Sequence, residues 1–418
     1  MKRFLITTLL TIFYFTVCSC TQLFAAGGGW RAAGTVDARS YGYQDLAGTD
    51  HLWFLPSADL SLYRLGAPYS LHLSGGYLGD NADEFAASGQ GRLTSLYLQY
   101  GDRMAGSGSA RLGRFFLFRG TALGVIDGFE AARTFNRHWS AAVYGGALGP
   151  VTRDFALTDP DCSPIFGGQV ALTTTGIPYS EVNRFTLSYA RQTRDEQLLR
   201  NRIALQTWQR LNSQLSWSNR LEGRLEGDFL RRFISRIRWT PPGWSALLEG
   251  GVFSPEVADG SWFNGFGEMS YTRLRVDIYR WWSLNRWGAG LDGAVLTAGD
   301  RSGIRLGPAL STPYGQAGYR LSAGDRSLVS TPWVNLHYGW GGGLNVYAVA
   351  SQTTYEWEAM EIESGELTAL IAGLKFTPGV TPNTTLTAEY QVYSTPEVTT
   401  DRRAQAALIW HFNTRSGR

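Results

Sequence analysis

Residues 215–229 read LSWSNRLEGRLEGDF, and this stretch decides the fold. Apolar residues and glycines occupy one parity, interrupted only by Asn219, while polar and charged residues occupy the other. Successive side chains of a β-strand point to opposite faces, so the pattern predicts a long strand with one apolar and one polar face. Soluble strands commonly run about 5–6 residues, whereas a tilted strand needs about 9–11 residues to cross the hydrocarbon of a bilayer. The length therefore favours a membrane barrel, which turns its apolar face to lipid, over a soluble sandwich with a dry core.

The same alternation recurs along the chain. Residues 183–190, 268–279 and 383–393 repeat it, and clusters of Gly, Pro, Asn and Asp separate the alternating segments. A barrel strand with its share of turn takes roughly 20 residues. We therefore predict an all-β fold, a transmembrane antiparallel up-and-down β-barrel of about 20 strands, in the range of about 16–22.

Aromatic residues gather near the ends of the expected strands. The chain has 15 tryptophans, and several stand beside turn signals, as at Trp239, Trp244 and Trp340. Amphipathic rings favour the headgroup level of a bilayer, so we expect an aromatic girdle at the rims of the barrel. The alternative is a set of buried core aromatics.

Residues 1–26 have the layout of a secretion signal, in which a short basic segment precedes the apolar run 4–17 and small residues follow. The run is shorter than the roughly 20 apolar residues of a membrane anchor. A second interpretation is a degenerate lipid-attachment site with Cys20 as the modified residue. We expect residues 1–26 to be a signal peptide and residues 27–418 to form a single barrel domain.

The composition excludes several classes of protein. The chain is 17% charged with a formal net charge of +3, whereas soluble domains carry about 25% charged residues. A near-neutral chain without a basic run is not built to bind nucleic acid through counterion release, and the abundant apolar residues exclude intrinsic disorder. Beyond residue 26 the one cysteine is Cys162, and no Cys-x-x-Cys-His sequence occurs. We therefore expect no covalent haem, no cysteine-based metal site and no cofactor.

Two segments carry a resemblance to a known family. Residues 403–412 alternate and end on the aromatic Phe412, like the closing strand of bacterial outer-membrane barrels, although six residues follow. Residues 111–114 (RLGR) and 126–129 (IDGF) are similar to a porin segment in which a Gly-Arg strand leads through a loop to an Asp-Gly strand. Phe115 stands where that family has Gln. The chain thus resembles the Gram-negative outer-membrane porin-type β-barrel family.

The resemblance implies a location in the bacterial outer membrane, with the lipid bilayer, lipopolysaccharide and the barrel-assembly machinery as partners. It also implies passive diffusion of small hydrophilic solutes through a water-filled lumen, often in a homo-oligomer. Two alternatives stay open. One is a structural barrel sheath around a multihaem cytochrome, in a porin–cytochrome electron conduit whose barrel holds no haem of its own. The other is a soluble exported β-protein.

The polar parity supplies candidate pore-lining residues. Opposed charges across a narrow point of a wet lumen create a field that orders permeating solutes. Arginine stays charged and binds carboxylate or phosphate with a planar fork, so a mild anion preference is our hypothesis. The alternative is that these charges form salt-bridge ladders that stiffen the wall. The candidates are Arg220, Glu222, Arg224, Glu226, Asp228, Arg236, Arg238, Arg273, Arg275, Asp277 and Glu389.

Two irregular stretches are expected to be loops. Residues 148–166 either fold into the pore as a constriction or project outward, and the glutamate-rich stretch 354–366 is predicted to be a solvated surface loop. The chain has only five histidines and no phosphate loop or HExxH sequence. We therefore predict that the protein is not an enzyme.

Overall fold

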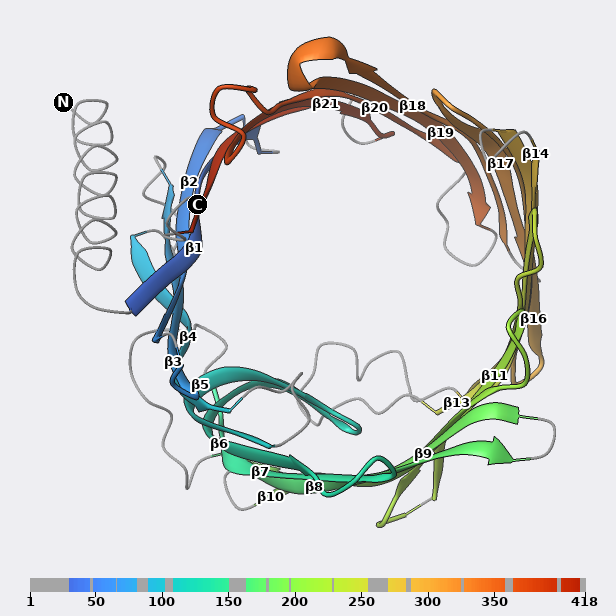
Figure 1. The fold of residues 1–418 in the computed structure, drawn as a ribbon. Helices are drawn as coiled ribbons and strands as arrows, with labels where there is room; N and C mark the ends of the chain where they lie inside the picture. Colours follow the sequence, from blue (N-terminus) through green and yellow to red (C-terminus); the bar gives the residue numbers. More distant parts are fainter. Residues whose placement is uncertain are drawn as a thin grey trace.

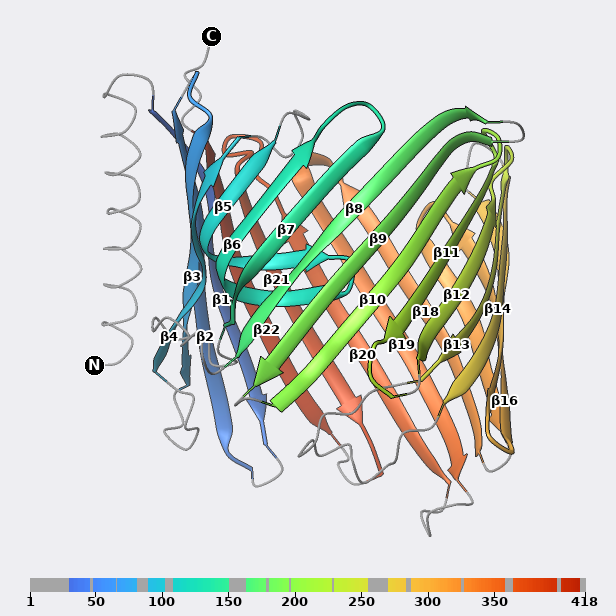
Figure 2. The ribbon, with the colours of Figure 1, turned by 90° about the horizontal axis from the view of Figure 1, so that it is seen from below.

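The computed structural model is a closed antiparallel β-barrel of 22 strands (Figures 1 and 2). It describes residues 30–45, 48–64, 66–80, 89–101, 108–149, 163–177, 180–194, 197–227, 229–254, 270–282, 287–324, 327–357, 364–396 and 400–413. Each strand pairs with its neighbours in sequence, and β22 closes the ring against β1, with Val36 opposite Trp410. Closure leaves no free sheet edge between the first strand and the last, which is the requirement for spanning a bilayer with strands. The predicted fold is confirmed.

The strands run from 10 to 15 residues, long enough to cross a bilayer with tilt. They are β1 (Trp30–Gln44), β2 (Asp50–Arg64), β3 (Tyr69–Asp80), β4 (Gln90–Tyr100), β5 (Ser109–Arg119), β6 (Ala122–Thr134), β7 (Trp139–Leu148), β8 (Pro164–Ile177), β9 (Ser180–Arg194), β10 (Gln197–Arg210), β11 (Leu215–Arg224), β12 (Leu230–Trp239), β13 (Trp244–Phe253), β14 (Tyr271–Trp282), β15 (Trp287–Ala298), β16 (Arg301–Thr312), β17 (Gly315–Gly324), β18 (Ser327–Trp340), β19 (Leu344–Trp357), β20 (Gly365–Phe376), β21 (Thr384–Ser394) and β22 (Asp401–Asn413).

The apolar parity of the strands lies on the outside of the barrel. On β14, Leu274, Val276 and Ile278 are 51%, 37% and 43% exposed, while the residues between them are half-buried and form ion pairs. A soluble protein buries such a row, whereas a membrane barrel presents it to lipid. Among the described residues, no helix is long and apolar enough to cross a membrane.

Within the part of the chain that the structure describes, eight tryptophans are exposed, and all of them lie at one rim of the barrel, where β1 begins and β22 ends. Seven are the first or last residue of a strand, and Trp217 is the third residue of β11. They are Trp30, Trp139, Trp217, Trp239, Trp244, Trp282, Trp287 and Trp340. This is the expected girdle, and it marks one of the two levels at which the barrel meets the headgroups.

The stretch 215–229 is not one strand, as we predicted, but a strand and a turn. Strand β11 ends at Arg224, and the chain reverses so that Gly223 pairs with Leu230 of β12. The backbone at Gly227 has a φ of +74°, a conformation that glycine adopts without strain. A register shift follows, because Glu222 pairs with Arg232, and it leaves Leu221 opposite Phe233 on the same face. The odd-numbered apolar residues therefore continue from β11 into β12, and the alternation hides the turn.

The expected loops are shorter than predicted where the structure describes them. Strand β19 continues to Trp357 and β20 begins at Gly365, so two of the glutamates assigned to the loop 354–366, Glu356 and Glu366, lie in strands. Their strands pair at Tyr355 and Gly365. Residues 150–162, which hold most of the stretch that we expected either to constrict the pore or to project outward, lie outside the described residues, as do residues 1–29.

Candidate functional site

The β5–β6 hairpin leaves the wall and enters the lumen. The ladder between β4 and β5 ends at Leu96 and Arg114, and the ladder between β6 and β7 ends at Ile126 and Leu148. Between these points, residues 115–125 pair only with each other. Figure 1 shows the hairpin inside the ring of strands, and Figure 2 shows it crossing at mid-height.

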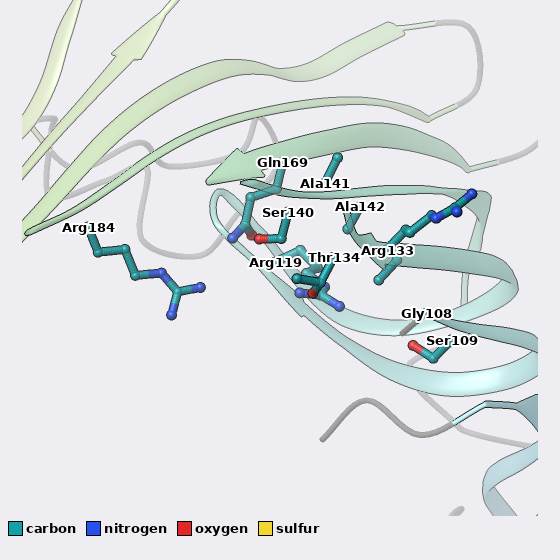
Figure 3. A pocket seen from close by; sticks show the side chains of 11 residues that line it. Gly108, Ser109, Arg119, Arg133, Thr134, Ser140, Ala141, Ala142, Gln169 and Arg184 are labelled. Carbon is teal, nitrogen blue, oxygen red and sulfur yellow. The ribbon is translucent and has the colours of Figure 1, made fainter. Parts of the chain in front are cut away.

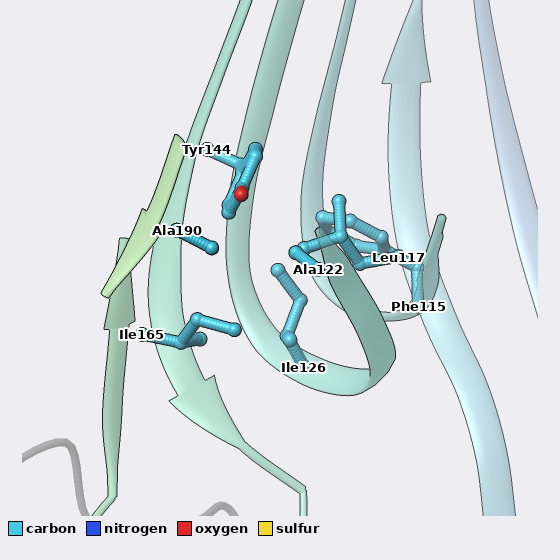
Figure 4. Close-up of a cluster of buried hydrophobic side chains, with 7 residues drawn as sticks. All are labelled: Phe115, Leu117, Ala122, Ile126, Tyr144, Ile165 and Ala190. Carbon is cyan, nitrogen blue, oxygen red and sulfur yellow. The ribbon is translucent and has the colours of Figure 1, made fainter. Parts of the chain in front are cut away.

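One face of the hairpin is packed against the inner wall (Figure 4). Its buried residues meet residues from three successive wall strands, and together they form a buried apolar cluster. The cluster consists of Phe115, Leu117, Ala122 and Ile126 from the hairpin and Tyr144, Ile165 and Ala190 from β7, β8 and β9. Alternation turns the opposite face of the hairpin to the lumen, where Phe116, Phe118 and Leu123 are 54%, 70% and 57% exposed.

The tip of the hairpin is fixed to the wall beyond this cluster. Gly120 has a φ of +53° and lies so close to β9 that a Cβ atom there would overlap the side chain of Ser188. The guanidinium of Arg220 on β11 donates a hydrogen bond to the carbonyl oxygen of Gly120 at 3.0 Å. The tip of the hairpin therefore reaches β11, which is the fifth strand after β6.

Buried ion pairs hold the base of the hairpin. Arg114 donates from Nε and Nη2 to the two carboxylate oxygens of Asp127, at 2.6 and 2.7 Å. Glu130 accepts from Arg111 at one oxygen and from Arg119 at the other. Bidentate pairs of this kind fix geometry as well as charge, so they set the angle at which the hairpin leaves the wall.

Sequence reasoning missed this hairpin, although the sequence contains a signal for it. Arg114 shares its parity with Leu112, and its cross-strand partner Asp127 shares the parity of Phe129. Leu112 and Phe129 lie opposite each other and are exposed on the outer face of the wall. A charged pair at positions that would face lipid is costly, so such a pair marks a place where the strands leave the wall.

Glu222, a predicted site residue, is the centre of a cluster with three arginines. It is buried, and Arg202, Arg220 and Arg231 all bind its carboxylate from β10, β11 and β12. Arg220 also holds the hairpin tip, so this cluster connects the wall to the hairpin. Three guanidiniums from three adjacent strands thus converge on one carboxylate.

Glu249 on β13, which we had not predicted, is the centre of a second cluster with two of the predicted arginines. Arg236 of β12 and Arg273 of β14 bind its two carboxylate oxygens. Next to it, Arg275 binds Asp277 on the same strand at 2.9 and 2.7 Å, and Arg305 lies 3.3 Å from Asp292. Adjacent strands β10–β16 thus carry a continuous arginine-rich surface on the lumen face.

The remaining predicted residues lie beside these clusters or away from them. Arg238 lies on the same face of β12, lining a cavity with Asp277 and Asp292, and Arg224, the last residue of β11, lies opposite Arg202 of the cluster around Glu222. Glu226 is exposed in the turn after β11, where Asn201 donates to it at 3.3 Å, so its assignment to the strand face is wrong. Asp228 lies outside the described residues. Glu389 lies on β21, where Tyr347, Gln391 and Gln405 donate to it.

The part of the wall around Glu389 differs from the arginine-rich surface. Its charged residues come in pairs of one base and one acid, Arg39 with Asp37 and Arg403 with Asp401. Hydroxyl and amide groups surround the carboxylate of Glu389. The lumen therefore has one strongly basic side and one side close to neutral.

No group of three or more His, Cys, Asp or Glu side chains within the described ranges is arranged to hold a metal ion. His72 lies between two serines, with Ser61 Oγ 2.9 Å from Nδ1 and Ser70 Oγ 2.8 Å from Nε2. Both ring nitrogens are thus engaged by hydroxyls, and neither binds a carboxylate that would orient a general base. The absence of enzymatic activity stays a prediction.

These observations define the class of the protein. A closed antiparallel barrel with an apolar outer surface, a tryptophan girdle and a charged interior is the architecture of bacterial outer-membrane β-barrels. The sequence predicted a transmembrane β-barrel in the bacterial outer membrane, and the structure has the architecture of that class.

No protein-family model and no curated protein sequence matches the chain. Solved structures with similar barrels include the translocation pore of the P pilus usher PapC, with 10% identity, a TM-score of 0.48 and coverage of 91% of this chain and 99% of that one. Pseudomonas aeruginosa OpdQ has 8% identity, a TM-score of 0.47 and coverage of 92% and 99%. Acinetobacter baumannii OccAB1 has 9% identity, a TM-score of 0.44 and coverage of 92% and 96%. Because these identities are 10% or lower and the TM-scores are below 0.5, the function is inferred from the residues of this chain alone.

Proposed function

We propose that the protein is an outer-membrane channel for passive diffusion of small hydrophilic solutes, with a preference for anions. A barrel that turns its apolar residues to lipid and its charged residues inward encloses an aqueous path. In the described part of the chain, the one segment that crosses this path is the β5–β6 hairpin, whose tip is fixed beside the cluster around Glu222. Solutes that pass the hairpin therefore pass close to arginine.

The observation that carries the anion preference is the arginine excess of the lumen surface on β12–β16. Five guanidiniums share this surface with three carboxylates, those of Glu249, Asp277 and Asp292; the five belong to Arg236, Arg238, Arg273, Arg275 and Arg305. The ion pairs are consistent with the alternative, in which salt bridges stiffen the wall. A ladder with equal numbers of acidic and basic side chains, however, would have no excess of positive charge. Rings and surfaces of arginine attract anions into a pore and repel cations.

Reversal potentials in planar bilayers test this proposal. Under a salt gradient, the wild type is expected to give a reversal potential whose sign shows that anions permeate better than cations. The double variant Arg236→Gln/Arg238→Gln removes two lumen charges and leaves Glu249 with Arg273, so its potential should move towards the cation value. Arg280→Gln is the matched control, because Arg280 lies on the outer face of β14, between the rings of Trp244 and Trp282.

The proposal is contradicted by the absence of ion conduction through the folded wild type, or by a reversal potential of cation sign. Equal shifts in the double variant and in Arg280→Gln would show that selectivity does not come from the lumen face of β12. Folding of each variant is checked by gel migration that changes on boiling, which is typical of folded barrels.

A further inference from the structure

A cavity of about 320 Å³ lies between the inturned hairpin and the inner wall (Figure 3). Its wall side comes from the lumen faces of β5–β9, and Arg119 near the hairpin tip covers it from the lumen side. The cavity exists only because the hairpin folds inward. It is separate from the arginine-rich surface of β10–β16.

The cavity carries an excess of positive charge. Arg119 shares the carboxylate of Glu130 with Arg111, so the three groups together keep one positive charge. Arg184 on β9 extends towards the cavity from its other end and has no ion-pair partner among the described residues (Figure 3). The side chain of Arg133 lies on the other face of β6, over the ring of Phe135.

The remaining polar lining can donate hydrogen bonds. Ser109, Thr134 and Ser140 contribute hydroxyls from β5, β6 and β7, and Gln169 contributes an amide from β8. No carboxylate lines the cavity in the described part of the chain. Donors from two guanidiniums, three hydroxyls and an amide match an oxyanion that can accept many hydrogen bonds.

We propose that this cavity is a binding site for the phosphate group of a small solute. Guanidinium forks bind phosphate in two-point contacts, and the volume exceeds that of the group itself, which leaves room for the rest of the solute. This site adds a class of ligand to the proposed channel. It rests on the proposed function, because the anion reaches the cavity through the lumen. Arg184 and Arg119 bind the charge, and the hydroxyls of Thr134 and Ser140 orient the oxygens.

Isothermal titration of the folded protein in detergent with inorganic phosphate tests the site without any need for conduction. We expect saturable binding to the wild type and affinity that falls about tenfold in Arg184→Gln, because one charge-assisted contact is lost. Ser140→Ala should weaken phosphate binding by a smaller factor. Arg280→Gln, which removes the same charge from the outer face, should bind phosphate like the wild type.

Three results would overturn the site: no phosphate binding to the folded wild type, equal binding to Arg184→Gln and the wild type, or acetate binding as tightly as phosphate. Failure of the channel proposal is a separate result. A protein that binds phosphate at this cavity but conducts with cation preference keeps the site and loses the anion channel, whereas an anion-selective channel that does not bind phosphate keeps the function and loses the site.

Discussion

Arg114 and Asp127 lie opposite each other on β5 and β6, at the level where the hairpin leaves the wall. Both are buried, and each oxygen of the carboxylate accepts a hydrogen bond from the guanidinium. A buried pair need not stabilise more than an apolar pair would, but removing one partner leaves an uncompensated charge. This pair is therefore one of the contacts that hold the base of the hairpin.

Arg114→Met keeps much of the volume of the side chain and removes from the Asp127 carboxylate the positive charge and the two hydrogen bonds of the guanidinium. We expect the free energy of unfolding to fall by about 3–5 kcal/mol, as for other buried pairs with one partner removed. The measurement is equilibrium urea unfolding of the barrel in lipid vesicles. Arg39→Met is the control, because its pair with Asp37 is exposed and should contribute about 0–1 kcal/mol. Equal losses of stability in the two variants would contradict this role of Arg114.

At the scale of elements, the hairpin carries apolar side chains on both faces. Phe115 and Leu117 are packed on the wall, while Phe116 and Phe118 face the lumen. Its position depends on a close approach of backbone to wall at Gly120, next to the hydrogen bond from Arg220. A side chain at Gly120 would push the tip away from β9 and widen or destabilise the constriction.

Gly120→Leu should therefore raise the single-channel conductance or make it fluctuate between levels. Gly227→Leu is a matched control, since Gly227 also has a positive φ in a hairpin turn but no atom near its missing Cβ. It adds the same kind of backbone strain without the contact to the wall. A conductance that is unchanged in Gly120→Leu, or changed equally in both variants, would show that the hairpin tip does not narrow the path.

The strands were predictable from the sequence because each alternates over a length set by the bilayer. β9, β14 and β21 contain the three predicted stretches 183–190, 268–279 and 383–393, apart from a few residues at their ends. The inturned hairpin was not predicted, because residues 115–118 are all apolar and only tertiary packing decides which of their two faces is buried. The cluster around Glu222 needed the register of β10–β12, which no spacing in the sequence reveals.

The barrel as a whole encloses an aqueous path only if the apolar face of its strands points to lipid and the polar face points to the lumen. Leu370 and Ile371 are neighbours in the middle of β20 and are similar in size. Leu370 is 51% exposed on the outer face, whereas Ile371 lies opposite Gln391 and Val349 on the lumen face. Chemically they are alike, so any difference between them reports the environment alone.

The most direct test is the reactivity of a cysteine placed at either position, in a Cys162→Ser background, with a charged water-soluble thiol reagent after folding into lipid vesicles. The account predicts that Ile371→Cys reacts, because its thiol meets water in the lumen, and that Leu370→Cys is protected by lipid. Protection of Ile371→Cys together with reaction of Leu370→Cys, or equal reaction of both, would contradict the central claim that this barrel encloses an aqueous path.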